Sequence, residues 1–100
     1  MPYHAPGPDR TIIHVRAGRV VASAAGLAKR PPAGELVLDL ADVTAVRTGE
    51  LVALAALNRA VRAAGGALRL VNVSAPVAGA LAANRLDAVL DIRPPGASAA

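Results

Sequence analysis

Few residues in this chain could carry out chemistry. The sequence has two histidines, His4 and His14, and no cysteine, which excludes disulfides, thiolate metal sites and thiol nucleophiles. Neither histidine has a second ligand at a metal-binding spacing. Asp39 and Asp42 could supply an acid, a base or a magnesium ligand, but carboxylates at this spacing more often cap turns and loops. We therefore expect no catalytic residue, no metal, no cofactor and no enzymatic activity.

One hydroxyl group has a more suggestive position. Thr48 precedes an apolar helical pattern, where an N-cap side chain would accept a hydrogen bond from the amide of Glu50 or Leu51. A helix N-terminus also tolerates an added phosphate, because its unpaired amides and the positive end of its dipole face that position, and Arg47 is adjacent. Glu50 opposes a phosphate by charge repulsion. The residues alone favour a structural cap over a phosphorylation switch.

The first half of the chain must supply the elements before this hydroxyl. Residues 11–15 are rich in β-branched side chains and predict a strand. A turn at Ala17-Gly18 leads to residues 19–21, which we expect to complete a hairpin. Ser23 then caps a short alanine-rich helical turn that ends before Pro31-Pro32.

The second half alternates strand and helix signals. Residues 35–40 form a nearly continuous apolar run, which is typical of a buried central strand. Apolar residues recur at helical spacing over 48–64, and Gly65-Gly66 ends that helix. The remaining predicted elements are a strand over 67–71, a helix opened by Ser74 and Pro76 that runs to Ala83, and a strand over 90–92. Parallel pairing of these strands plus the leading hairpin gives a mixed sheet.

Length and composition fit one small domain. The 100 residues are 54% hydrophobic and 18% charged, so a packed core is expected. We assign residues 1–10 to a disordered arm, 11–93 to the domain and 94–100 to a flexible tail. Neither an export signal nor an apolar stretch long enough to span a bilayer is evident, which predicts a cytoplasmic protein without membrane insertion.

The positive charge does not predict nucleic-acid binding. The formal charge is +4, but the arginines are dispersed along the chain and Tyr3 is the only aromatic residue. Single-strand binding usually needs aromatic stacking platforms, and a recognition helix needs several bases on one face. We therefore do not expect nucleic-acid binding.

The sequence resembles the STAS domain of anti-sigma factor antagonists over about residues 35–92. The stretches that carry the resemblance are residues 36–44, 46–54, 64–74 and 77–81, followed by Leu86-Asp87. It implies an α/β, STAS-like sandwich with a mixed four- to five-stranded sheet and packed helices. In the family, the first Ser or Thr of an Asp-Ser-Ser-Gly-Leu-like segment is phosphorylated by a partner anti-sigma factor with kinase activity. The unphosphorylated form captures that partner and frees the sigma factor.

This resemblance assigns roles to particular residues. An ungapped match makes Thr48 the candidate phosphoacceptor, and the candidate partner-binding residues, here called the docking face, are Asp42, Thr44, Arg47, Gly49 and Glu50. Arg47 and Glu50 depart from the family pattern, where an acid and a glycine stand. Arg85 also replaces a usual glycine, so we expect Asn84 to adopt the left-handed backbone conformation instead.

Two other functions stay open. The first is a phosphorylation-independent STAS adaptor in a signalling or transporter-associated assembly, suggested by the altered Arg47 and Glu50. The second is an enzyme or small-ligand binder, which would require an enclosed pocket lined by Asp39 and Asp42.

Overall fold

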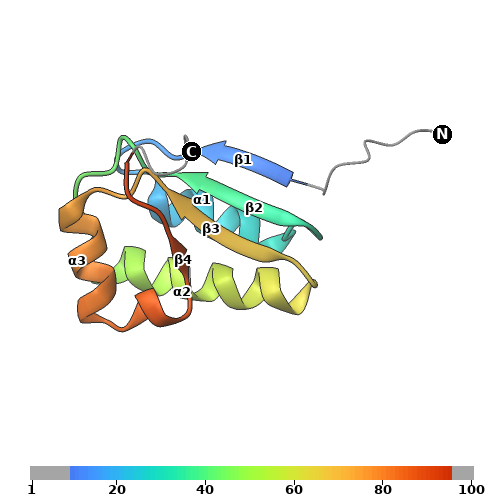
Figure 1. Ribbon diagram of the computed structural model, residues 1–100. Coiled ribbons are helices and arrows are strands. Elements are labelled where there is room, and N and C mark those ends of the chain that lie inside the picture. Colours follow the sequence, from blue (N-terminus) through green and yellow to red (C-terminus); the bar gives the residue numbers. More distant parts are fainter. Residues whose placement is uncertain (1–9, 96–100) are drawn as a thin grey trace.

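The structure is a computed structural model that describes residues 10–95. The predicted arm and tail lie outside this range, apart from Arg10, Pro94 and Pro95. The described chain alternates strands and helices (Figure 1). In order, the elements are β1 (Arg10–His14), α1 (Val20–Lys29), β2 (Glu35–Asp39), α2 (Thr48–Ala63), β3 (Ala67–Val71), α3 (Ala75–Ala83), the 3-10 helix η1 (Leu86–Ala88) and β4 (Asp91–Ile92).

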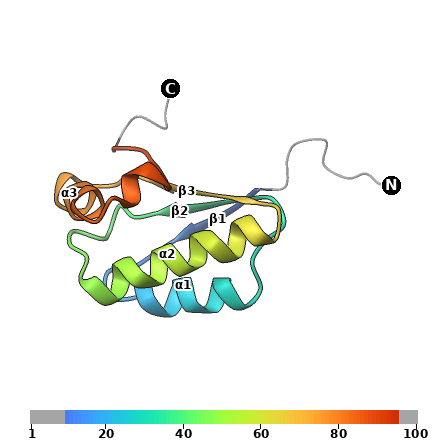
Figure 2. The same cartoon turned by 90° about the horizontal axis from the view of Figure 1, so that it is seen from below.

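The four strands form one sheet in the order β1-β2-β3-β4, and every neighbouring pair is parallel. Helices α1 and α2 pack against each other and cover one face of the sheet (Figure 2). Helix α3 lies apart from this pair and contacts η1. The α/β fold expected from the sequence is therefore confirmed, with a sheet whose strands are all parallel.

The predicted hairpin over residues 11–21 is wrong, and with it the mixed character of the sheet. Residues 20–29 form α1, so Ser23 lies inside a helix. Val20 and Ala24, four residues apart, are both buried, which is the helical spacing of a face packed on α2 and the sheet. The β-branched pair Val20-Val21 favours a strand locally, but burial of one helical face outweighs that preference.

The central strand and the long helix are confirmed. Leu36, Val37 and Leu38 are all buried in β2, as a strand covered on both faces requires. In α2, the leucines and the valine that set the helical period face the core, which comprises on this helix Leu51, Leu54, Leu57 and Val61. The apolar period of the sequence therefore identified the buried side of α2.

Two glycines end α2. The Gly65 amide donates to the Arg62 carbonyl at 3.0 Å and the Gly66 amide to the Val61 carbonyl at 2.9 Å, the bonds of a Schellman motif. Gly65 has φ +86°, which favours glycine. Gly66 is needed for a different reason, because a Cβ there would collide with the carbonyl oxygen of Gly34.

The third helix and the last strand agree with prediction, but the turn between them does not. Arg85 itself adopts the left-handed conformation at φ 60°, whereas Asn84 has φ −104°. The Asn84 side-chain amide instead donates to the carbonyl of Ala80 at 2.8 Å, which satisfies a carbonyl at the end of α3. The prediction that Asn84 would adopt the left-handed conformation in place of Arg85 is therefore wrong.

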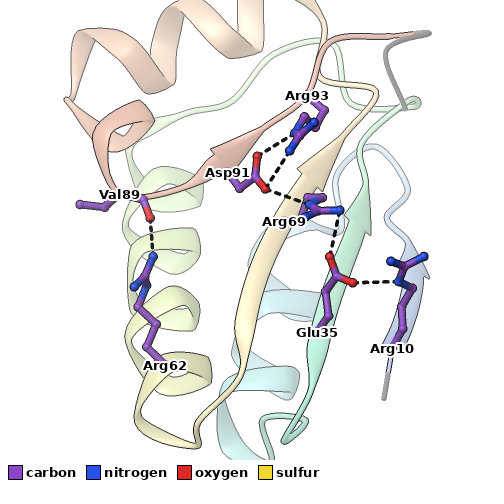
Figure 3. Close-up of polar contacts among 7 residues, drawn as sticks. All are labelled: Arg10, Glu35, Arg62, Arg69, Val89, Asp91 and Arg93. Atoms are coloured by element: carbon purple, nitrogen blue, oxygen red, sulfur yellow. Dashed lines mark hydrogen bonds and ion pairs between the residues drawn. The ribbon is translucent and has the colours of Figure 1, made fainter. Parts of the chain in front are cut away.

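The sheet face opposite α1 and α2 carries a row of alternating charges, which we call the charge ladder (Figure 3). It runs across all four strands through Arg10, Glu35, Arg69, Asp91 and Arg93. The nitrogen–oxygen distances of the four contacts lie between 2.8 and 3.0 Å. The Arg93 and Arg69 guanidiniums hold the pKa of the Asp91 carboxyl below its usual value.

Candidate functional site

The loop between β2 and α2 positions the predicted docking face. Leu40 and Val43 are buried and anchor the loop, and the Val43 amide donates to the Leu40 carbonyl at 2.9 Å. Thr44 and Arg47 are exposed on the outer side of the same loop. The apolar anchors thus hold the backbone in place while polar side chains face solvent.

Thr48 is exposed at the first position of α2. The prediction that it serves as the N-cap is wrong, because Arg47 occupies that position, with extended backbone angles of φ −104° and ψ 172°. The Arg47 amide donates to the Glu50 carboxylate at 2.6 Å. Glu50 therefore supplies one half of a capping box, and an arginine side chain has no acceptor for the other half.

An open groove of about 550 Å³ lies at the start of α2, lined by Arg47 and Gly49 but not by Thr48, which stands between them in the sequence. One wall is the loop and the first turn of α2, and four of the five docking-face residues line it, namely Thr44, Arg47, Gly49 and Glu50. The other wall is Ala17, Gly18 and Val21, at the start of α1. Both helices begin at the same end of the molecule (Figure 2), which brings these walls together.

The wall from α1 was missed by sequence reasoning, because a hairpin was expected there. Val21 follows the buried Val20 in α1 and is 48% exposed, so it is the structure, and not the sequence pattern, that identifies this side of the groove.

The fifth docking-face residue, Asp42, lies in a separate group that we call the His14 cluster, formed by His14, Asp39, Asp42 and Asn72. His14 Nε2 is 2.8 Å from Asp42 Oδ2, and His14 Nδ1 is 3.5 Å from Asp39 Oδ2. Asp39 Oδ1 also accepts hydrogen bonds from the Asn72 side chain at 3.1 Å and from the Ala41 amide at 3.0 Å. Asn72 follows β3 directly and has φ 55°.

These contacts shift two pKa values. The hydrogen bonds to Asp42 and then to Asp39 raise the pKa of His14 above 6.5, since they favour the protonated ring. Partial burial penalises the Asp39 carboxylate, but the hydrogen bonds from Asn72, Ala41 and His14 outweigh it and lower the pKa of Asp39. Sequence spacing gave His14 no partner, yet the parallel sheet brings it to both aspartates.

The enzyme or small-ligand alternative gains no support from this geometry. It required an enclosed pocket lined by Asp39 and Asp42, whereas the groove is open and is lined by neither carboxylate. Across residues 10–95, no group of three or more acidic, histidine or cysteine residues is arranged to hold a metal ion. The aspartates act in hydrogen bonds at the end of the sheet, as turn-capping carboxylates do.

The structure is a four-stranded parallel sheet with α1 and α2 on one face, and an exposed loop precedes its longest helix. The family profile of the STAS domain matches residues 7–99, and the chain belongs to that family. A search of curated proteins gave no match.

Solved structures show the same fold. One is the crystal structure of the protein TM1081 from Thermotoga maritima, titled a "putative anti-sigma factor antagonist". It superposes with a TM-score of 0.72 at 16% identity over 90% of this chain and 83% of the other. The NMR structure of TM1081 gives a TM-score of 0.72 at 17% identity, over 99% of this chain and 88% of the other. In the part of the chain that the structure describes, no helix has the length and apolar character needed to cross a bilayer.

Proposed function

We propose that this STAS domain is an anti-sigma factor antagonist-like regulatory protein of the cytoplasm. Its docking face binds a partner anti-sigma factor with kinase activity, and phosphorylation of Thr48 by that partner ends the complex. The observation that carries the proposal is that Thr48 is exposed at the first position of α2, between Arg47 and Gly49, which both line an open groove. Two likenesses support an anti-sigma factor as the partner. The sequence motif resembles that of antagonists, and the fold is similar to that of TM1081, which is described as a "putative anti-sigma factor antagonist".

The groove has the chemistry of a protein-binding surface. Its α1 wall is small and apolar, through Ala17, Gly18 and Val21, while its other wall carries the opposite charges of Arg47 and Glu50. Apolar residues next to charged and polar ones are the usual composition of a protein interface.

A phosphate on Thr48 would change the charge of this surface. It adds about −1.5 to −2 charges, next to Glu50 and Arg47. The positive end of the α2 dipole and the amides of its first turn offset part of that charge within the protein. A partner with acidic groups at the interface would be repelled, so a single modification can separate the two proteins.

The test begins with the partner. The full chain is used to capture proteins from an extract of its source cells, and a captured anti-sigma factor kinase is purified and incubated with the full chain and ATP. Tryptic cleavage after Arg47 yields the peptide 48–59, in which Thr48 is the only hydroxyl residue. A phosphoryl group on that peptide, absent from Thr48→Ala, is the expected result. Failure to capture an anti-sigma factor, or transfer to another residue, contradicts the proposal.

One observation favours a second function, a STAS adaptor that binds constitutively. The Glu50 carboxylate already accepts the Arg47 amide at 2.6 Å, so an anion occupies the position that a phosphate would use at this helix end. Titration calorimetry with the captured partner distinguishes the two functions. Thr48→Glu is expected to weaken a switched complex at least about tenfold, as charge repulsion at an interface does. A change within a few-fold, matching Thr48→Ser, indicates the adaptor.

A further inference from the structure

Three exposed arginines stand at the groove where α1 and α2 begin (Figure 2). The Arg19 amide donates to the Arg16 carbonyl at 3.0 Å, which closes a turn. The two central residues of that turn, Ala17 and Gly18, line one wall of the groove, and Arg47 lines the other. We call Arg16, Arg19 and Arg47 the arginine rim. The groove therefore has positively charged residues on both of its sides.

None of the ion pairs within residues 10–95 involves the arginine rim. The two acids closest to Arg47 in the sequence have other contacts, since Glu50 accepts the Arg47 amide and Asp42 contacts His14. The first turn of α1 contains no acid. Beyond the described range, the sequence has one acidic side chain, Asp9, which precedes β1, whereas the rim follows the carboxyl ends of β1 and β2. The described structure thus leaves the charge of the rim unmatched.

Other arginines of the chain have structural contacts. Those of the charge ladder each contact a carboxylate, and Arg62 donates to the Asn58 side chain and the Val89 carbonyl. Three further exposed arginines have no acidic partner within residues 10–95 but are distant in sequence from every groove-lining residue, namely Arg30, Arg59 and Arg85. What distinguishes the rim is the gathering of three such arginines at one groove.

We propose that the partner docks here through an acidic segment, whose carboxylates pair with Arg16 and Arg19 on one side of the groove and with Arg47 on the other. This inference rests on the proposed function and specifies the chemistry of the segment that binds there. A guanidinium holds a carboxylate through two parallel hydrogen bonds, so the rim suits this group. An apolar side chain of the same segment would contact Ala17 and Val21. The formal charge of +4 also attracts an acidic partner from a distance.

An acidic peptide fits this groove better than a nucleic acid does. Small apolar side chains lie between the arginines, namely Ala17, Val21, Val43 and Ala45. A sugar–phosphate backbone has little apolar surface to place on them, whereas a peptide can alternate acidic and apolar residues. Binding of single strands usually relies on aromatic side chains, and the groove lining has none.

An NMR titration of the isotope-labelled full chain tests the proposal without the natural partner. The probe is a short peptide of alternating glutamate and leucine, and its control has glutamine in place of glutamate. The acidic peptide is expected to shift the amide signals of residues 16–21 and 43–50, and the control peptide to leave them unchanged. Raising the salt concentration from about 0.05 M to about 0.5 M should weaken the binding, because it screens charges beyond about 4 Å.

The double variant Arg16→Glu/Arg19→Glu is expected to raise the dissociation constant of the acidic peptide at least about tenfold, because two attractive contacts become repulsive. Lys29→Glu/Arg30→Glu is the matched control. It changes the net charge equally, but both residues are exposed at the other end of α1, about 15 Å away along the helix. We expect it to change the dissociation constant by less than about twofold, since exposed charges at that distance are screened. Circular dichroism checks that each variant is folded.

Three results would overturn the proposal. The first is an acidic peptide that shifts no signals at the groove. The second is binding that the two double variants weaken equally, because only net charge would then matter. The third is a short oligothymidylate that binds the same residues more tightly than the peptide, which would assign the rim to nucleic acid. These readouts do not involve Thr48, so a captured partner of another class would contradict the proposed function and leave the acidic segment standing.

Discussion

At the scale of single residues, the start of α2 shows how one carboxylate decides the role of a neighbour. Glu50 caps the helix by accepting the Arg47 amide, so the Thr48 hydroxyl is not needed for that purpose. The sequence predicted where the helix begins but assigned its cap to the wrong side chain. A hydroxyl that is exposed and not used in capping is better suited to modification than one held in a structural hydrogen bond.

The His14 cluster could not be predicted from spacing along the chain. His14 and Asp42 are 28 positions apart, and they meet only because the carboxyl ends of β1 and β2 lie side by side. Ends of parallel strands are known gathering places for polar groups, but that argument needs the strands to be parallel. Because a hairpin over residues 11–21 was expected, the prediction did not place His14 beside Asp39 and Asp42.

A pH titration tests the cluster directly. The pKa of His14 is raised by Asp42 first and Asp39 second, so its stabilising contribution is complete below pH 6.5 and is lost as the pH rises through the raised value. Asp42→Asn removes the larger cause and is expected to lower the pKa of His14, measured from the ring proton signals by NMR. Asp87→Asn, a change in η1, is expected to leave it unchanged. Equal midpoints in the wild type and Asp42→Asn would contradict the assignment.

At the scale of elements, the long periodic helix was predicted over nearly its whole length, whereas the short alanine-rich helix was predicted only from Ser23 onward and in fact begins at Val20. α2 combines sixteen residues, a clear apolar period and a glycine stop, and its bounds agree with prediction to within one residue. α1 has ten residues, and neither an acidic first turn nor a side-chain cap marks its start. Its helical character comes from packing on α2, which a local pattern does not contain.

The glycine pair after α2 illustrates a packing requirement that the sequence did not reveal. Gly66→Ala is expected to lower the free energy of unfolding by about 1–3 kcal/mol, because its Cβ would collide with the Gly34 carbonyl oxygen and force the backbone apart. Gly26→Ala, in the exposed middle of α1 with open space around it, is expected to raise it by about 0.5–1 kcal/mol. Urea denaturation measures both. A destabilised Gly26→Ala, or a neutral Gly66→Ala, would show that these contacts do not control stability.

At the scale of the whole molecule, the two faces of the sheet differ in what lies on them. One is covered by α1 and α2, and the groove lies between the start of α1 and the loop that leads from β2 into α2. The other is bridged by the charge ladder, which links all four strands without a covering helix. Charged residues were visible in the sequence, but the register that alternates their signs depends on strand pairing and was not predictable.

Glu35 is the central acid of the ladder, bonded to Arg10 at 2.8 Å and to Arg69 at 3.0 Å, and its side chain is only 16% exposed. Glu35→Gln removes both ion pairs while keeping the shape of the side chain, and leaves two arginines facing each other across β2. We expect the free energy of unfolding to fall by about 1 kcal/mol, at the upper end of values for surface pairs because the acid is mostly shielded from water. High salt should shrink the difference from the wild type, since it screens the arginine pair. Asp87→Asn is the control and should change stability little. If Glu35→Gln unfolds at the same urea concentration as the wild type, the sheet is held by its hydrogen bonds and the α1–α2 core alone.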